Sequence, residues 1–247
     1  MTSQAVLITG ALSGIGRATA IAFAQAGARV VISGRREDAG QALAMELRDL
    51  GAAAEFIRAD VRREDDVRAL VDRAVARFGR LDAAVNNAGV EGTPGPLTEQ
   101  SADSYASVFD TNVLGVVLSL KHELRVMQAQ GSGSIVNLSS VLGHKAFPNV
   151  AIYTASKHAV DGLTKAAALE AAAFGVRVNA VGPGPVATPM LDRFAAEGPQ
   201  RDALTAAVPM RRAAAAEEIA RTILFLASDH ASYVSGQVLF VDGAMSA

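Results

Sequence analysis

Short runs rich in β-branched residues alternate with longer Ala-, Leu-, Glu- and Arg-rich segments along the whole chain of 247 residues. The longer segments, such as residues 36–50 and 63–78, carry apolar residues at three- and four-residue steps, which is typical of amphipathic helices. Strands that alternate with helices form βαβ units, whose parallel sheet is covered by helices on both faces. The sequence therefore predicts an α/β fold with a doubly wound, seven-stranded parallel sheet. The predicted strands are residues 5–9, 29–33, 54–59, 82–87, 134–140, 176–181 and 237–243.

The alternation continues without a linker-like change of composition, an internal repeat or a low-complexity tract beyond the richness in alanine. We therefore expect one domain, residues 1–247. The least regular part is the Pro-rich segment 183–210, which interrupts the alternation. A long irregular segment in a compact domain is often functional, so we expect a lid or substrate loop there.

Composition and charge exclude several classes of function. A net charge of −2 provides no basic field for nucleic acid or an anionic membrane. The absence of cysteine excludes disulfides and thiolate chemistry, and four scattered histidines do not predict a metal site. No run of 18 apolar residues predicts a membrane span, and the N-terminus has no features of a secretion peptide. We expect a cytoplasmic protein that binds a small molecule.

Three glycines stand between the first predicted strand and the first predicted helix, at Gly10, Gly14 and Gly16. Glycines in this position let the backbone approach a pyrophosphate, whose charge meets the free N–H groups at the helix N-terminus. The spacing is G-x-x-x-G-x-G, and a purely structural turn is the alternative. The position in the first βαβ unit favours nucleotide binding.

Five motifs in order resemble those of the short-chain dehydrogenase/reductase family. They are TGALSGIG (9–16), NNAG (86–89), SS (139–140), YTASK (153–157) and PGPVAT (183–188). The resemblance covers essentially the whole chain. It implies a single-domain Rossmann fold, a nicotinamide cofactor and hydride transfer between an alcohol and a carbonyl compound.

Tyr153 and Lys157 stand one helical turn apart, so their side chains share a helix face. A ketone that accepts hydride needs a proton donor, which a phenol can be, and a nearby cation favours the phenolate. The resemblance implies that Tyr153 is the general acid/base and that Lys157 also holds the nicotinamide ribose. It further implies that Ser140 holds the substrate oxygen and that Asn112 supports a water relay to the lysine. The alternatives are a strand-end cap for Ser140 and a helix hydrogen bond for Asn112.

The same resemblance implies the other contacts to the cofactor. Asp60 and Val61 would contact the adenine, residues 87–89 the adenosine ribose, and Val186 and Thr188 the nicotinamide carboxamide. The alternatives are a helix cap for Asp60 and a plain turn for the loop 86–89. Together with Tyr153 and Lys157, the predicted cofactor residues are Gly10, Ser13, Gly14, Ile15, Gly16, Arg35, Asp60, Val61, Asn87, Ala88, Gly89, Pro183, Val186 and Thr188.

The end of the second strand favours NADP over NAD. An NAD site places a carboxylate there for the ribose 2′-hydroxyl. This chain has Gly34 at that position, followed by Arg35, whose guanidinium can bind a 2′-phosphate. NAD remains the alternative, because Ser13 is neutral and Glu37 and Asp38 stand close by. Arg35 and Arg36 could also be a solvated pair.

The substrate side predicts a mostly apolar pocket for a lipophilic ketone or secondary alcohol, with core packing as the alternative for each residue. By the resemblance, the segments around the nicotinamide contribute Val90, Leu142, His144, Phe147, Met190 and Phe194.

The leading prediction is an oxidoreductase. The alternatives are a protein that senses NAD(P) without turnover, or a reductase of a sugar or acyl-thioester ketone. Apolar helices at 104–127 and 152–174 resemble the family's dimer interface, and strand 237–243 would supply a second one. The sequence therefore predicts a homotetramer with closed two-fold symmetry.

Overall fold

The computed structural model of the chain describes residues 4–195 and 198–247. Residues 1–3 and 196–197 of the predicted domain 1–247 lie outside the described residues. Residues 196–197 also belong to the predicted loop 183–210.

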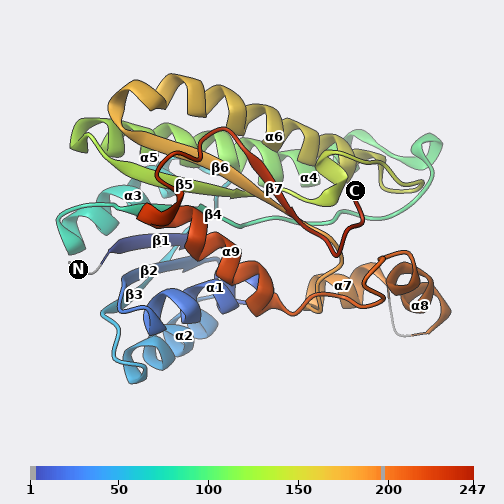
Figure 1. Cartoon of the computed structure of the whole chain (residues 1–247), viewed down its shortest axis with the longest axis horizontal. Coiled ribbons are helices and arrows are strands. Elements are labelled where there is room, and N and C mark those ends of the chain that lie inside the picture. The colour runs from blue at the N-terminus through green and yellow to red at the C-terminus, as the bar shows by residue number, and fades with distance from the viewer. Residues whose placement is uncertain (1–3, 196–197) are drawn as a thin grey trace.

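The sheet has seven parallel strands in the order β3-β2-β1-β4-β5-β6-β7 (Figure 1). The chain winds outward from β1 in one direction and then from β4 in the other, which is the doubly wound arrangement that the sequence predicts. All seven predicted strands are confirmed, with small differences at their ends. They are β1 (Ala5–Thr9), β2 (Arg29–Gly34), β3 (Ala54–Arg58), β4 (Ala83–Asn86), β5 (Gly133–Leu138), β6 (Val176–Pro183) and β7 (Val238–Val241).

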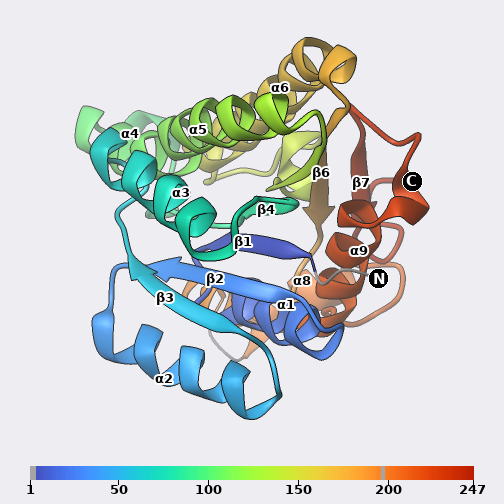
Figure 2. The same cartoon turned by 90° about the vertical axis from the view of Figure 1, so that its left-hand side faces the viewer.

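Helices cover both faces of this sheet, as expected for an α/β fold of the Rossmann type (Figure 2). One face carries α1 (Gly14–Gln25), α2 (Glu37–Asp49) and α9 (Ala216–Ala227). The other carries α3 (Glu64–Phe78), α4 (Ala102–Phe109), α5 (Gly115–Gln130) and α6 (Ala151–Ala171). The short helices α7 (Pro189–Phe194) and α8 (Pro199–Ala206) lie in the predicted substrate loop, beyond one end of the strands (Figure 1).

The two faces have separate apolar cores because successive strand residues point to opposite sides. In β1, Val6 and Ile8 pack with α1, α2 and α9, whereas Ala5 and Leu7 pack with the helices of the other face. Every residue of β1 is buried. A strand buried on both faces has a continuous apolar sequence, which explains why the strands were recognisable from sequence.

A buried polar network joins the ends of β4 and β5 to the helices above them. The amide of Asn86 donates to Glu123 Oε2 and to Asn137 Oδ1, both at 3.0 Å. Asn137 in turn donates to Thr164 Oγ1 of α6 at 2.9 Å. Glu123 on α5 is 1 % exposed, and this burial raises the pKa of its carboxyl to about 7. The network fixes the carboxyl ends of two central strands against α5 and α6.

In the part of the chain that the structure describes, no helix is both long enough and apolar enough to cross a lipid bilayer.

Candidate active site

The turn between β1 and α1 brings two backbone segments into close contact. Gly10 has φ of 63°, and a Cβ atom on it would lie 2.7 Å from Ala88 Cα and 2.8 Å from Ala88 N. Any larger residue would therefore push away the loop that follows β4. The side-chain amide of Asn87 fastens the same contact by donating to Gly10 O at 2.9 Å and to Thr9 O at 3.1 Å.

Gly16 serves helix packing in this turn. A Cβ on Gly16 would lie 2.4 Å from the carbonyl oxygen of Gly10, so only glycine lets α1 approach the turn this closely. Gly16 does not line the cavity that the turn borders.

The N-terminus of α1 suits an anion. Ser13 is the N-cap residue, and within the described residues its side chain makes no capping hydrogen bond. The first backbone N–H groups of a helix have no partner inside the helix, and together with the helix dipole they attract phosphate. Ser13, Gly14 and Ile15 all line the adjoining cavity. Thr188, at the start of α7, borders it from the opposite side, where its Cγ2 would lie 3.1 Å from a Cβ on Gly14.

This cavity has a volume of about 270 Å³ and lies against the segments that follow β1, β2, β3 and β4. The glycine-lined wall, the free helix N-terminus and the guanidinium groups fit the phosphates and ribose of a nicotinamide dinucleotide. The structure brings together most of the predicted cofactor residues here: Gly10, Ser13, Gly14, Ile15, Arg35, Asp60, Val61, Asn87, Ala88, Gly89 and Thr188.

Pro183 and Val186 do not line the cavity. Pro183 ends β6 and pairs with Val241 of β7. Val186 is buried in the core and forms an isolated β-bridge with Ala214. The contact of these two residues with the cofactor stays a prediction.

Asp60 is held by Arg62. The guanidinium donates to the carboxylate at 2.9 Å from Nε and at 2.5 Å from Nη2, and the Arg62 N–H donates to Asp60 Oδ1 at 3.1 Å. These hydrogen bonds hold the pKa of Asp60 below its ordinary value. The side chain therefore closes the turn before α3 and also lines the cavity, but it does not cap the helix, because the N-cap of α3 is Arg63.

The end of β2 presents two guanidinium groups to the cavity. Arg35 and Arg36 are exposed and line it, and neither forms an ion pair with a carboxylate of the described residues. Glu37 and Asp38 lie in the first turn of α2, where the helix dipole favours acidic residues, and they do not line the cavity. Gly34 packs under Leu12, since a Cβ there would lie 2.6 Å from a Leu12 methyl carbon.

Ser140, Tyr153 and Lys157 do not line this cavity, but Lys157 Nζ lies 3.7 Å from the Cβ position of Gly89, which does. Ser140 is the N-cap of the turn Val141–Gly143, where its Oγ accepts from Leu142 N–H at 3.1 Å. The Tyr153 side chain hydrogen-bonds with Ser140. Lys157 Nζ donates to the Leu138 carbonyl at 2.8 Å and lies 5.5 Å from the centroid of the Tyr153 ring.

Burial, more than the lysine, governs ionisation of the tyrosine in this structure. Burial raises the pKa of Tyr153 to about 12, and the hydrogen bond with Ser140 only partly opposes this rise. Burial likewise lowers the pKa of Lys157 to about 8. In this structure the Lys157 ammonium is directed toward the Leu138 carbonyl, and its effect on the phenolate stays a prediction. The phenol is neutral at pH 7.

Asn112 lies on a π-helical segment, Asp110–Leu114, that divides the predicted helix 104–127 into α4 and α5. Its amide donates to Val90 O at 2.9 Å and to Ser156 Oγ at 3.1 Å, and its Oδ1 accepts from Val90 N–H at 2.8 Å. Single turns of π-helix are often found at functional sites. Asn112 thereby fixes the loop after β4. Asn112 Oδ1 and Lys157 Nζ both lie within 4 Å of the position that a Cβ atom on Gly89 would take.

Of the predicted substrate residues, the structure brings four near the tyrosine or the cavity. Val90 and Met190 line the cavity, and Leu142 and Phe194 belong to an apolar cluster with Tyr153. His144 and Phe147 are exposed on the loop before α6, where the His144 ring lies 5.4 Å from the ring of Phe240. These two residues are not brought to Tyr153, which agrees with a rim or loop position for His144.

Comparison with known proteins agrees with this geometry. A family model described as enoyl-(acyl carrier protein) reductase matches residues 10–246. The chain is 46 % identical over 244 residues to a cis-4-hydroxycyclohexanecarboxylate dehydrogenase of Sinomonas cyclohexanicum, covering 99 % of this chain and 97 % of that one. The crystal structure of levodione reductase superimposes with a TM-score of 0.95 at 37 % identity, covering 99 % of this chain and 98 % of that one. The structure of ElxO with NADP bound superimposes with a TM-score of 0.92 at 34 % identity, covering 100 % and 99 %.

The chain belongs to the short-chain dehydrogenase/reductase family. It is an oxidoreductase that transfers hydride between a nicotinamide cofactor and a ketone or secondary alcohol.

This short-chain dehydrogenase/reductase has an ion pair at its site that the sequence did not predict. Glu91, two residues beyond the loop 87–89, accepts from Arg193 of α7 at 2.6 Å from Nε and 3.2 Å from Nη2. The carboxylate side chain is 12 % exposed and the arginine 60 %, so the negative end faces inward. Its charge contributes to raising the pKa of Tyr153. A charged residue two positions beyond the loop 87–89 was the sequence signal.

We expect Gly10→Ala to lose most of the binding of a nicotinamide cofactor, because its Cβ would displace the loop at Ala88. Gly27→Ala is the matched control: Gly27 also has a positive φ, of 79°, but nothing lies within 4 Å of its Cβ position. The control should lose only about 1 kcal/mol of unfolding free energy from backbone strain and should keep cofactor binding. Fluorescence titration and urea denaturation measure both effects. Equal affinity in the two variants would contradict the role given to this close contact.

Proposed function

We propose that this oxidoreductase interconverts a lipophilic ketone and its secondary alcohol with NADP(H), and that Ser140, Tyr153 and Lys157 carry out the proton transfer. The observation that supports the proposal is that Tyr153 interacts with Ser140 and packs against an apolar cluster, while Lys157 Nζ lies 3.7 Å from the Cβ position of Gly89 in the cavity wall. Six-membered cyclic ketones are the first candidates, because the relative named above acts on a hydroxycyclohexane ring.

When bound, the nicotinamide ring supplies or accepts the hydride. The Tyr153 hydroxyl, neutral because its pKa is near 12, donates a proton to the carbonyl oxygen as that oxygen gains negative charge. The Ser140 hydroxyl donates a hydrogen bond to the same oxygen. This pair of donors stabilises the developing alkoxide in a site with little water.

Lys157 acts on the phenolate that remains after the proton has been donated. Its ammonium, 5.5 Å from the centre of the Tyr153 ring, stabilises the negative charge that accumulates there. With a pKa near 8 the lysine is still mostly protonated at pH 7. We also assign it the cofactor ribose, and we assign Asn112 the support of a relay toward this lysine.

Replacing Tyr153 by Phe should lower kcat about 10²- to 10⁴-fold, because the proton donor is lost, and should leave cofactor affinity near that of the wild type. Tyr105→Phe is the control, since Tyr105 is exposed on α4 and stacks on Phe109.

Glu91→Gln tests whether the ionisation of Tyr153 controls the reaction. Because the Glu91 charge opposes the phenolate, its removal should move the pH dependence of alcohol oxidation to lower pH.

The control for that shift is Asp192→Asn, which removes an exposed carboxylate paired with Arg201 on the neighbouring helix. An unshifted profile in Glu91→Gln, or comparable kcat in Tyr153→Phe, would rule out the proton-transfer role of Tyr153.

The cofactor preference rests on the end of β2. Gly34 leaves no carboxylate for a ribose 2′-hydroxyl, and Arg35 and Arg36 line the cavity as two unpaired cations among the described residues. Glu37 and Asp38 lie in the first turn of α2 and do not offset them inside the cavity. A relative has been solved with NADP bound, which is compatible with this preference.

We expect wild-type kcat/KM to favour NADPH over NADH with one shared ketone, and Arg35→Ala to reduce that preference about tenfold or more, as expected for a charge-assisted contact to phosphate. Arg17→Ala is the control, because Arg17 lies on α1, outside the lining, and pairs with Glu46. A wild-type preference for NADH would show that the assignment of NADP is wrong.

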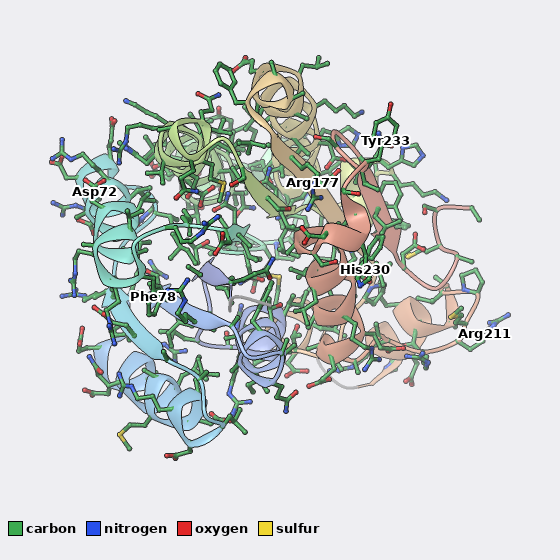
Figure 3. The ribbon with its side chains drawn as sticks, turned by 60° about the vertical axis from the view of Figure 1, so that its left-hand side comes forward. Asp72, Phe78, Arg177, Arg211, His230 and Tyr233 are labelled. Carbon is green, nitrogen blue, oxygen red and sulfur yellow. The ribbon has the colours of Figure 1, made fainter. Side chains whose placement is uncertain are left out.

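We further propose a cytoplasmic homotetramer. On α6, Leu169 is 83 % exposed, and Leu114 and Val117 leave further apolar surface at the start of α5. Leu239 of β7 and the fully exposed Tyr233, labelled in Figure 3, are the exposed apolar residues that we assign to a second such surface. Two self-complementary faces of this kind close into a tetramer.

Light scattering should therefore give four times the chain mass of 25.5 kDa, and Leu169→Glu should reduce it to that of a dimer. Glu170→Gln, a change at the neighbouring polar position of α6, should keep the tetramer. A monomeric mass for the wild type at micromolar concentration would contradict the proposal.

The alternative functions can be separated in one screen. Cyclic ketones, a sugar ketone and a β-ketoacyl thioester are each tested with both nicotinamide cofactors. Cofactor binding without turnover of any of them would favour a sensor, whereas a preference for the thioester would move the substrate class to acyl chains.

A further inference from the structure

The end of the chain folds back toward the catalytic tyrosine. The C-terminal turn, residues 242–247, follows β7, and its Gly243 and Ala244 have left-handed φ values of 64° and 70°. Ala244 N–H donates to Asp242 Oδ1 at 3.1 Å, and Met245 N–H donates to Asp242 O at 3.3 Å. Alanine rarely adopts a positive φ, so the surrounding structure must hold this turn in place. Figure 1 shows the C-terminus at the same end of the sheet as α7.

Two segments that border the site hold the C-terminal turn. The ammonium of Lys145, just after the turn Val141–Gly143, donates to the Met245 carbonyl oxygen at 2.6 Å. The end of the substrate loop contacts it from the other side. There Met210 N–H donates to Gly243 O at 3.3 Å, and a Cβ on Gly243 would lie 2.7 Å from a Val208 methyl carbon.

These contacts bury the Met245 side chain, which is 9 % exposed. It belongs to a small apolar cluster with Val141, Leu142, Val150 and Val208. Tyr153 and Phe194 pack against this cluster. The cluster therefore joins the turn Val141–Gly143 (the catalytic turn), helix α6, the substrate loop and the C-terminus. Met245 is therefore the contribution of the C-terminus to the apolar surroundings of the tyrosine.

We propose that Met245, tethered by Lys145, forms a wall of the substrate pocket and limits the size of the apolar part of the substrate. This inference rests on the proposed function, since it places the ketone beside Tyr153. A thioether side chain is flexible and adapts its shape to an apolar ligand. Its removal frees volume in the cluster against which Tyr153 packs, and a bulkier ring substituent can occupy that volume without a change to Ser140, Tyr153 or Lys157.

The experiment compares cyclohexanone with 4-tert-butylcyclohexanone at saturating NADPH. Met245→Ala should raise the ratio of kcat/KM for the bulky over the small ketone by about tenfold or more, as expected when several methylene groups of pocket volume are freed. Met245→Leu, which conserves volume, should change the ratio little. Met45→Ala is the control for loss of a methionine, because Met45 is 60 % exposed on α2. Lys145→Ala should shift the ratio in the same direction as Met245→Ala, since it releases the carbonyl tether.

A second measurement does not need turnover or a folded Met245→Ala variant. The wild type is labelled with ¹³C at its six methionine methyl groups, and Met245→Leu identifies the signal of Met245. Adding cyclohexanone to enzyme saturated with oxidised NADP forms a complex that cannot react, and the Met245 signal should then shift while that of Met45 does not. An unshifted Met245 signal, or an unchanged selectivity ratio in folded Met245→Ala, overturns the proposal.

The two failures are distinguishable. A wild type that reduces neither ketone but shows the Met245 shift contradicts the proposed reaction and supports the wall. Turnover without the shift supports the proposed reaction and contradicts the proposal that Met245 forms a wall of the substrate pocket.

Discussion

The contact between Gly10 and the backbone of Ala88 is the constraint on which the site depends. It lies between β1 and β4, the neighbouring strands from which the chain winds in opposite directions. Their following segments diverge at this point, which opens a crevice at the carboxyl ends of the strands. Asn87 holds the two segments together by donating to Gly10 O and Thr9 O. Without a glycine at position 10 the β4 loop moves, and with it the lining from Ala88 to Val90.

The side chains that we propose as catalytic are linked to that loop through Asn112. Asn112 binds both backbone groups of Val90, and it reaches them because a π-helical segment turns its amide toward the sheet. The same amide reaches Ser156, one residue before Lys157. Burial raises the pKa of Tyr153 and so keeps its hydroxyl protonated. The ammonium of Lys157 donates to the Leu138 carbonyl. A buried phenol beside a cation can lose its proton to a nearby alkoxide without leaving an uncompensated negative charge.

The fold was predictable from sequence because its signals are local. The buried parallel strands are rich in apolar and β-branched residues, and Gly10, Gly14, Tyr153 and Lys157 are recognised from neighbours within a few residues. The missed contacts join residues far apart in the chain. The backbone bridge of Val186 joins it to Ala214, and Glu91 meets an arginine 102 positions away. Lys145 and Met245 are separated by 100 positions. No periodicity or motif encodes such pairs, because they arise only when separate loops meet at the end of the sheet.

The two halves of the site are therefore built differently. The cofactor half consists of backbone turns at the ends of strands, where glycines pack against main-chain atoms and a substitution disturbs the sheet itself. The substrate half consists of side chains from the catalytic turn, the substrate loop and the C-terminal turn, joined by the Glu91–Arg193 ion pair and the Lys145 tether. Changing Met245 or Phe194 alters an apolar surface without moving a strand. Substrate choice can thus vary within one scaffold while the cofactor site and the proton-transfer residues stay fixed.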